Sequence, residues 1–152
     1  MTHSLHTLLE HAERERDDAM AALLQAEEAG RRLRQQMEQL QTYHAEYAAR
    51  SPAQGGRAAP IDQLRGHHAF MQRLDQALAQ QQGLLQGADH QVLQARQLLL
   101  SRETRVASVR KLAERRALEQ QRATDRREQK RSDESATQRH WHDNAHSRTV
   151  TH

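Results

Sequence analysis

The sequence predicts an all-α protein, a long two-helix antiparallel coiled-coil hairpin with an overhanging second helix and a disordered C-terminal tail. Two segments, 5–47 and 64–116, repeat apolar residues in alternating steps of four and three, and a proline- and glycine-containing segment at 51–60 separates them. Such a repeat, sustained over many turns, keeps a narrow apolar stripe against one partner helix, which a globular core does not require.

The composition excludes a compact globular domain. Hydrophobic residues make up 36% of the chain, aromatic residues 3% and charged residues 28%, and the mean hydropathy is −1.05. There is therefore too little apolar volume to fill a three-dimensional core. Ala, Leu, Gln, Arg and Glu dominate, and these strong helix formers distinguish the chain from disordered polar sequences. The absence of cysteine excludes disulfides, a thiolate nucleophile and a Cys-based zinc site.

The first helix is expected over residues 4–49, with Thr2 or Ser4 as its cap. Ten of its thirteen stripe positions are apolar. Residues 1–30 hold seven acidic and two basic residues, a balance that favours the N-terminal end of the helix dipole. The stripe positions are Leu5, Leu9, Ala12, Arg16, Ala19, Leu23, Ala26, Gly30, Leu33, Met37, Leu40, His44 and Tyr47.

A loop is expected over residues 50–60, because this segment holds both prolines of the chain and two of its six glycines. Gly55 and Gly56 do not form a phosphate-binding loop, since no strand precedes them and no Lys-Ser or Lys-Thr pair follows. Pro60 suits the first helical position and Asp62 the first turn, so a second helix is expected to begin here.

The second helix is expected over residues 61–131, and twelve of its sixteen stripe positions are apolar. The partner of the first stripe therefore lies in the same chain. Beyond Leu118 the apolar positions become sparse, and residues 132–152 are expected to form a flexible polar tail. The stripe positions are Leu64, His67, Met71, Leu74, Leu78, Gln81, Leu85, Ala88, Val92, Ala95, Leu99, Arg102, Val106, Val109, Ala113 and Arg116.

Folding the chain at the loop pairs positions whose numbers add up to about 110, which places Leu5 near Val106 and Tyr47 near Leu64. Residues 107–131 would then project beyond the first helix. Residues 101–131 hold eleven Lys and Arg against five acids. The acidic start of the first helix would face three cations of the second, Arg96, Arg102 and Arg105, and this complementarity favours the antiparallel hairpin, although exposed pairs contribute little energy.

Three of the few aromatic residues cluster beside the loop. Tyr43 and Tyr47 are the only tyrosines, Phe70 is the only phenylalanine, and Leu40 and Leu74 accompany them. One interpretation is that these side chains close the stripe at the loop end. The other is a docking patch for a protein, because Tyr and Phe offer a large contact area at low entropy cost.

At these residues the sequence resembles the family of the flagellar export protein FliJ, part of the bacterial type III export apparatus. The resemblance covers most of residues 1–131 and includes a length near 150 and a hairpin rich in Gln and Arg. The family motif continues to a position matched here by Gln81, where a histidine would be expected. The residues that carry the resemblance are Gln36, Leu40, Tyr43, Tyr47, Phe70, Leu74 and Ala77.

The resemblance implies that these seven residues dock on the membrane export-gate protein. It also implies a non-enzymatic stalk without a cofactor, whose helix ends near the termini enter the pore of the hexameric export ATPase, and which assists export chaperones. We expect a cytoplasmic protein associated peripherally with the inner face of the cell membrane. The candidates for the ATPase contact, among which none stands out, are Arg110, Lys111, Arg115 and Arg116.

Two other classes of binding protein fit parts of the sequence. The equivalent stalk of a virulence type III secretion system is a similarly plain coiled coil. A basic coiled coil that binds nucleic acid would fit the isoelectric point near 9.9. The net charge is only +3, however, and no base-reading motif is present, so we expect no nucleic-acid partner.

Metal binding and membrane insertion are not expected. The eleven histidines include the groups His67-His68 and His140-Trp141-His142, with His146 and His152 nearby, but no His-Glu-x-x-His motif or closed ligand set occurs. No window approaches the roughly 18 apolar residues of a membrane span, and the N-terminus lacks the apolar core of a signal peptide.

Overall fold

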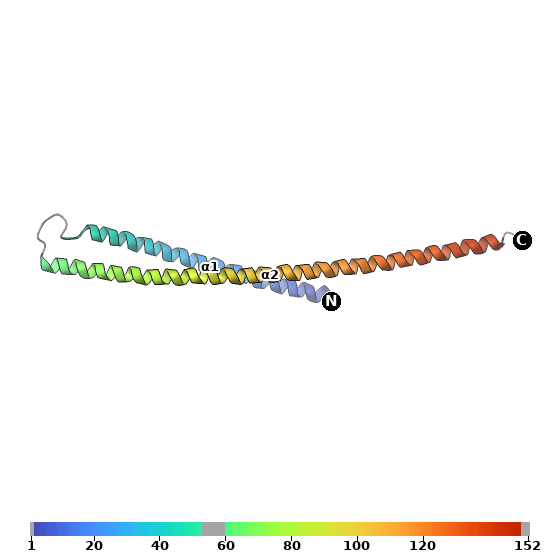
Figure 1. Cartoon of the computed structure of the whole chain (residues 1–152), viewed down its shortest axis with the longest axis horizontal. Helices are drawn as coiled ribbons and strands as arrows, with labels where there is room; N and C mark the ends of the chain where they lie inside the picture. Colours follow the sequence, from blue (N-terminus) through green and yellow to red (C-terminus); the bar gives the residue numbers. More distant parts are fainter. Residues whose placement is uncertain (1, 53–59, 150–152) are drawn as a thin grey trace. The chain divides into compact units, whose positions relative to one another are not determined.

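The computed structural model describes residues 2–52 and 60–149. The described part forms two helices, α1 at Thr2–Ala49 and α2 at Ile61–Thr149, which pack against each other as a helical hairpin (Figure 1). The all-α hairpin prediction is confirmed. Gly55 and Gly56 lie outside the described residues.

Backbone hydrogen bonds define the two helix ends beside the loop. At the end of α1, the Arg50 N–H donates a hydrogen bond to the Tyr47 carbonyl at 3.2 Å. This bond spans three residues, whereas an α-helical bond spans four. At the start of α2, the Pro60 carbonyl accepts from the N–H groups of Gln63 and Leu64, at 3.1 and 3.2 Å. Pro60 therefore lies immediately before α2 rather than inside its first turn.

The hairpin divides into two compact units, which are described separately. The loop-side unit comprises residues 13–104, and the terminal unit comprises residues 1–12 and 105–152.

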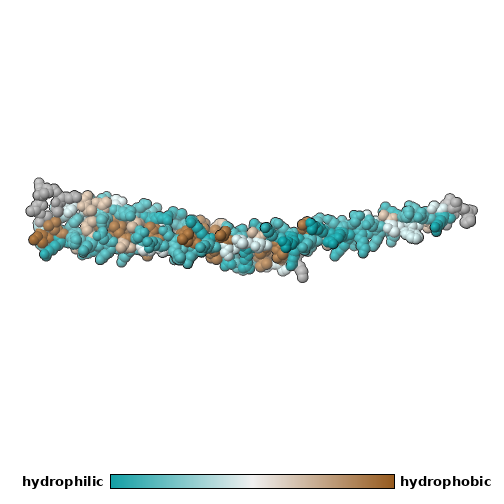
Figure 2. Space-filling view, viewed as in Figure 1, coloured by the Kyte–Doolittle hydropathy of each residue, from teal (hydrophilic) through white to brown (hydrophobic). Residues whose placement is uncertain are grey.

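In the loop-side unit the helices meet along the predicted stripes. Every stripe position of α1 from Arg16 to Tyr47 is buried or half-buried, and so is every stripe position of α2 from His67 to Arg102. Leu64, the first position on α2, is 37% exposed. Hydrophilic residues cover most of the visible face, because the apolar contact is a narrow seam (Figure 2). The buried stripe residues of this unit are Ala19, Gly30, Leu74, Gln81 and Ala88.

The register between the helices differs from the expected one. Tyr47 stacks on Phe70 instead of lying near Leu64, and Glu15 pairs with Arg102 over 2.9 Å. Each partner on α2 lies about seven residues further from the loop than expected, which is one heptad. The stripes overlap equally well after a shift of one heptad, so the repeat alone does not distinguish the two registers.

In the terminal unit the first turns of α1 pack on α2 residues beyond Arg105. The buried apolar residues here are Leu5, Ala12, Val106 and Val109, with exposures of 8%, 1%, 3% and 8%. Ala113 and Arg116 are still half-buried. The overhang therefore begins beyond Arg116 rather than at residue 107, as the shift in register requires.

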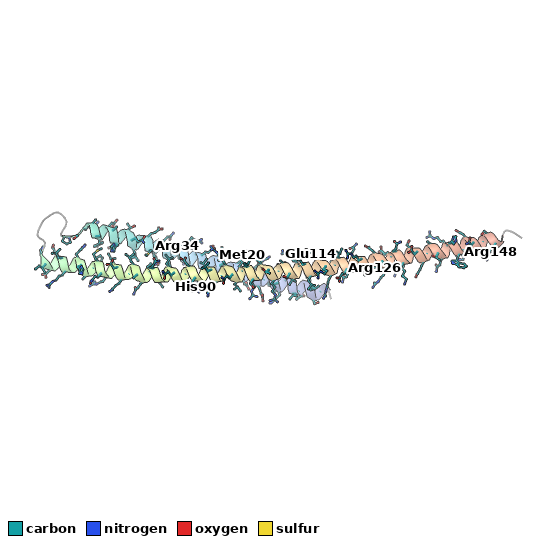
Figure 3. All side chains as sticks on the ribbon, viewed as in Figure 1. Met20, Arg34, His90, Glu114, Arg126 and Arg148 are labelled. Carbon is teal, nitrogen blue, oxygen red and sulfur yellow. The ribbon has the colours of Figure 1, made fainter. Side chains whose placement is uncertain are left out.

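α2 continues to Thr149 and does not end at Arg131, which corrects the expected boundary. No proline or glycine follows Gly87 in the sequence, so nothing breaks the helix. Local contacts one turn apart continue along this stretch, such as the Thr137 Oγ1 bond to the Asp133 carbonyl at 2.8 Å. From residue 124 to 148 every side chain is exposed, as Figure 3 shows around Arg126 and Arg148.

Candidate docking surfaces

The aromatic cluster beside the loop contains two half-buried rings and one exposed ring. The ring centroids of Tyr47 and Phe70 are 4.5 Å apart with an interplanar angle of 43°, and both side chains are half-buried across the seam. The Tyr43 ring lies 4.8 Å from that of Tyr47 and is 46% exposed. Tyr47 and Phe70 therefore close the seam, while Tyr43 presents an aromatic surface supported by them.

Polar groups hold the two tyrosines in place. The Tyr43 hydroxyl donates a long hydrogen bond to the Tyr47 hydroxyl, at 3.5 Å, and this bond raises the pKa of Tyr43 above its ordinary value because it favours the protonated phenol. The Arg50 guanidinium carbon lies 5.9 Å from the centre of the Tyr47 ring, within the range of a cation–π contact. Tyr43 is therefore a neutral aromatic side chain at physiological pH.

Gln81 forms hydrogen bonds between the two helices near the aromatic cluster. It is only 9% exposed, and its Nε2 donates to the Leu33 carbonyl at 3.0 Å and to the Gln36 Oε1 at 3.1 Å. The residue at which the sequence departs from the FliJ motif thus satisfies its buried amide and orients Gln36. The heptad repeat predicted the stripe position of Gln81, but nothing in the repeat indicated these two hydrogen bonds.

Two open hollows adjoin the exposed Tyr43 ring. One, of about 410 Å³, is lined by Gln36, Gln39, Leu40, Tyr43 and Gln81. The other, of about 530 Å³, is lined by Gln35, Glu38, Gln39, Thr42, Tyr43 and Glu46. A partner that contacts Tyr43 can therefore place side chains on both sides of the ring.

The seven predicted site residues all lie in the loop-side unit and differ in exposure. Gln36 and Tyr43 are exposed, Leu40 and Ala77 are half-buried, and Leu74 is 8% exposed within the seam. Leu74 therefore supports the surface from below. We define the loop-end surface as Gln36, Leu40, Tyr43, Tyr47, Phe70, Ala77 and Gln81.

The predicted cationic residues of α2 lie in the terminal unit and do not share one side of the helix. Arg110, Lys111 and Arg115 are exposed, whereas Arg116 occupies a stripe position and is half-buried. Lys111 and Arg115 are four residues apart and so lie on the same side of α2.

Within residues 2–52 and 60–149, no three His, Asp or Glu side chains are placed to hold a metal ion. His152 lies outside the described residues. None of the described helical segments has the length and apolar character needed to cross a membrane.

Two long helices packed as a hairpin place the chain in the class of all-α coiled-coil proteins. A family model described as flagellar FliJ protein matches residues 1–145, and the chain belongs to that family. It is therefore a component of flagellar type III export. No match was found among the curated proteins.

Proposed function

We propose that this chain is a non-enzymatic stalk that couples the hexameric flagellar export ATPase to the membrane export-gate protein and assists export chaperones. It acts in the cytoplasm, held at the inner face of the membrane by its partners rather than by insertion. The observation that carries the proposal is the exposed Tyr43 ring on the Tyr47–Phe70 stack. Its chemistry suits a protein partner, since aromatic residues with a rigid support are frequent hot spots of interfaces.

The loop-end surface is the proposed contact with the export gate. Tyr43 inserts into the partner, and Gln36, fixed by the Gln81 bond, supplies an amide beside it. The hollow of about 410 Å³ between them accepts an apolar partner side chain against Leu40. Leu74, also expected to touch the gate, contributes by supporting the surface.

The exposed cations of the terminal unit are the proposed contact with the ATPase. Arg110, Lys111 and Arg115 project from α2, and Arg116 contributes from the edge of the seam. Cationic side chains on a helix fit an acidic pore lining, and exposed charges of this kind increase association rates more than affinity. Duplex DNA is the competing anionic partner for the same residues.

Replacing Tyr43 by Ala tests the gate contact. We expect binding to the purified export-gate protein to weaken at least about tenfold, since a central aromatic anchor commonly contributes 2 kcal/mol or more. Titration calorimetry measures the loss. Met20→Ala is the control, because Met20 is also on α1 and is 43% exposed but lies outside the loop-end surface. Equal affinity of the Tyr43 variant and the wild type would exclude this contact.

Replacing Lys111 and Arg115 by Glu tests the ATPase contact. We expect the double variant to lose stimulation of ATP hydrolysis by the purified hexamer, because both side chains are exposed and the charge change opposes an acidic pore. Circular dichroism checks that the helices remain. Full stimulation by the variant would exclude these two side chains as the ATPase contact. Binding of the wild type to duplex DNA at physiological salt would favour the nucleic-acid alternative.

A further inference from the structure

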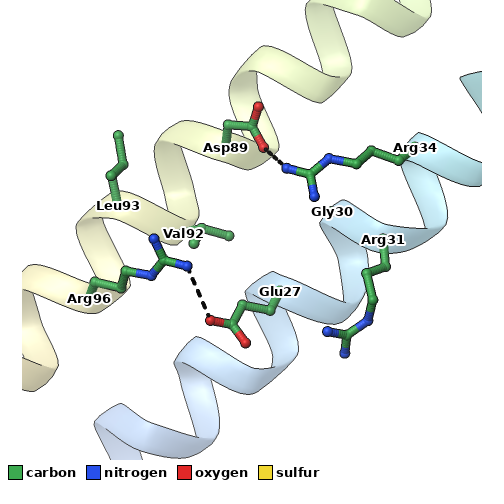
Figure 4. A pocket seen from close by; sticks show the side chains of 8 residues that line it. All are labelled: Glu27, Gly30, Arg31, Arg34, Asp89, Val92, Leu93 and Arg96. Carbon is green, nitrogen blue, oxygen red and sulfur yellow. Dashed lines mark hydrogen bonds and ion pairs between the residues drawn. The ribbon is translucent and has the colours of Figure 1, made fainter.

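The polar side chains of α2 have different partners along its length. In the loop-side unit they form ion pairs across the hairpin, as Asp89 does with Arg34 at 3.1 Å (Figure 4). From residue 124 to 148 every side chain is exposed, and hydrogen bonds there connect residues one helical turn apart. Asn144 Nδ2, for example, lies 3.3 Å from His140 Nε2. Near the end of α2, side chains four residues apart are therefore the ones that can act together.

One pair of histidines has this spacing. His142 and His146 are the only two of the eleven histidines that lie four residues apart in the sequence. Both belong to α2 and are exposed, so their imidazole rings project from the same side of the helix. In the flexible tail expected for residues 132–152 this spacing would have had no consequence. The helix makes the two rings neighbours.

Two imidazoles one turn apart form a bidentate ligand for a transition-metal ion. Imidazole nitrogen suits Zn²⁺, Cu²⁺ and Ni²⁺, whereas Mg²⁺ and Ca²⁺ prefer oxygen ligands. In the described part of the chain no three His, Asp or Glu side chains are placed to hold an ion, so the site offers two protein ligands and water completes the coordination. Such an open site holds its ion less tightly than a closed structural zinc site.

The charges near the pair neither favour nor oppose a cation strongly. The charged residues within one turn of either histidine are Arg139, Asp143 and Arg148. Arg139 lies one turn before His142 on the same side, and Asp143 lies one turn before His146, so their charges offset each other. Arg148 projects from another side of α2. The affinity for the ion therefore comes from the two imidazole nitrogens.

Binding of an ion to this pair would stabilise the end of α2. Helical segments without tertiary contacts are only marginally stable, and the side chains of residues 124–148 are all exposed. His142 and His146 lie close enough to hold one ion together only while the turn between them is helical. The free energy of ion binding is therefore coupled to helix formation in this segment.

We propose that His142 and His146 together bind a divalent transition-metal ion of the Zn²⁺ class, and that the bound ion stabilises the last turns of α2. The ion is held within one helix of one chain. The site is distinct from the loop-end surface and from the four cations proposed to contact the ATPase. It does not depend on the proposed stalk function.

Trp141 provides a local readout for the test. It is the only tryptophan of the chain, is 73% exposed, and lies next to His142. The full chain is titrated with CuCl2, because Cu²⁺ quenches the fluorescence of an indole held close to it. We expect saturable quenching that ZnCl2 reverses by competition and MgCl2 does not. His142→Ala should weaken the apparent affinity at least about tenfold, since one of two ligands is lost.

Two variants serve as matched controls. His140→Ala also removes a histidine beside Trp141, but His140 projects from another side of α2, towards Asn144, so the affinity should change less than about threefold. His146→Ala with Ser147→His keeps the number of histidines and changes the spacing from four residues to five. This double variant should bind as weakly as His142→Ala, because the two rings no longer share one side of the helix.

Circular dichroism tests the effect on the helix. Excess ZnCl2 should increase the helical signal of the wild type and shift the gradual loss of that signal on heating to higher temperature, with no such change in His142→Ala. Any of four results would overturn the proposal. They are quenching that ZnCl2 does not reverse, equal weakening by His140→Ala, which would mean adventitious binding to exposed histidines, wild-type affinity of the five-residue variant, and a helical signal that bound Zn²⁺ leaves unchanged.

Discussion

At the scale of single residues, the position of each aromatic side chain relative to the seam determines what it can do. Tyr47 is a stripe residue, so it packs on Phe70 across the hairpin. Tyr43, four residues earlier, lies beside the stripe and remains 46% exposed. Because Tyr47 supports the Tyr43 ring on one side, the exposed ring loses little entropy when a partner covers it.

The tyrosine pair predicts a change in titration. Tyr47→Phe removes the acceptor of the Tyr43 hydrogen bond, which is the main cause that raises the Tyr43 pKa above 10.0, so the pKa of Tyr43 should fall. A raised pKa means that this bond stabilises the folded protein at neutral pH and is lost as the pH rises through the Tyr43 pKa. Ultraviolet absorbance of phenolate measures the change directly, because the variant retains one tyrosine.

Tyr43→Phe, which retains Tyr47 as its single tyrosine, is the control for this experiment. If the remaining tyrosine of Tyr47→Phe titrated at a pH as high as the later of the two wild-type transitions, the hydrogen bond would not be the cause of the shift.

The sequence predicted which residues near the loop lie in the seam better than the bonds that they make. The heptad pattern identified Leu40, Leu74 and Gln81 as seam positions, and the structure places them there. That Gln81 would bond both the Leu33 carbonyl and Gln36 could not be predicted, since a polar stripe residue can also point its amide to solvent. The partners of a polar stripe residue depend on the register between the two helices, which the heptad repeat does not determine.

At the scale of the two helices, individual pairs of polar or charged residues select the register. A shift by one heptad leaves leucine and alanine stripes in contact, so apolar packing hardly distinguishes the alternatives. The observed register aligns Glu15 with Arg102, His44 with Asp75 and Gln36 with Gln81. In the expected register Gln36 would have faced Leu74, and the buried Gln81 amide would have needed a different acceptor.

A charge exchange between Glu15 and Arg102 tests this register. The two side chains are 27% and 34% exposed and lie 2.9 Å apart. Glu15→Arg should lower the free energy of unfolding by about 1 kcal/mol, and adding Arg102→Glu should restore much of the loss, because the pair is rebuilt with reversed polarity. Urea unfolding followed by circular dichroism measures both effects.

The control is the double variant Glu15→Arg with Arg105→Glu. It makes the same change from Arg to Glu on α2, but three residues away from Arg102. Restoration by Arg105→Glu as large as that by Arg102→Glu would show a general charge effect and would leave the register unsupported.

At the scale of the whole chain, the two proposed contact regions belong to different units. The loop-end surface lies within residues 13–104, and the cations Arg110, Lys111, Arg115 and Arg116 lie in the terminal unit. The hairpin connects them with helix alone in the described residues, so each contact can be altered by substitution without entering the other unit.

The end of α2 is the feature of the chain that the sequence predicted least well. The expected boundary at Arg131 followed the end of the apolar stripe, whereas helix formation also depends on local propensity and on bonds one turn apart. Residues 132–149 have no stripe but contain only residues compatible with a helix, and α2 includes them. A stripe therefore predicts where a helix packs, and its end need not be the end of the helix.

Removing residues 125–152 tests whether the exposed end of α2 supports the hairpin. All side chains from 124 to 148 are exposed, so the midpoint of cooperative thermal unfolding should change by no more than about 2 °C. Helices without tertiary contacts are only marginally stable, so the full chain should lose part of its helical signal gradually before the main transition, and the shortened chain should lack this early phase. Circular dichroism at 222 nm follows both. A fall in the midpoint by about 5 °C or more would show that this segment packs on the hairpin and contributes to its stability.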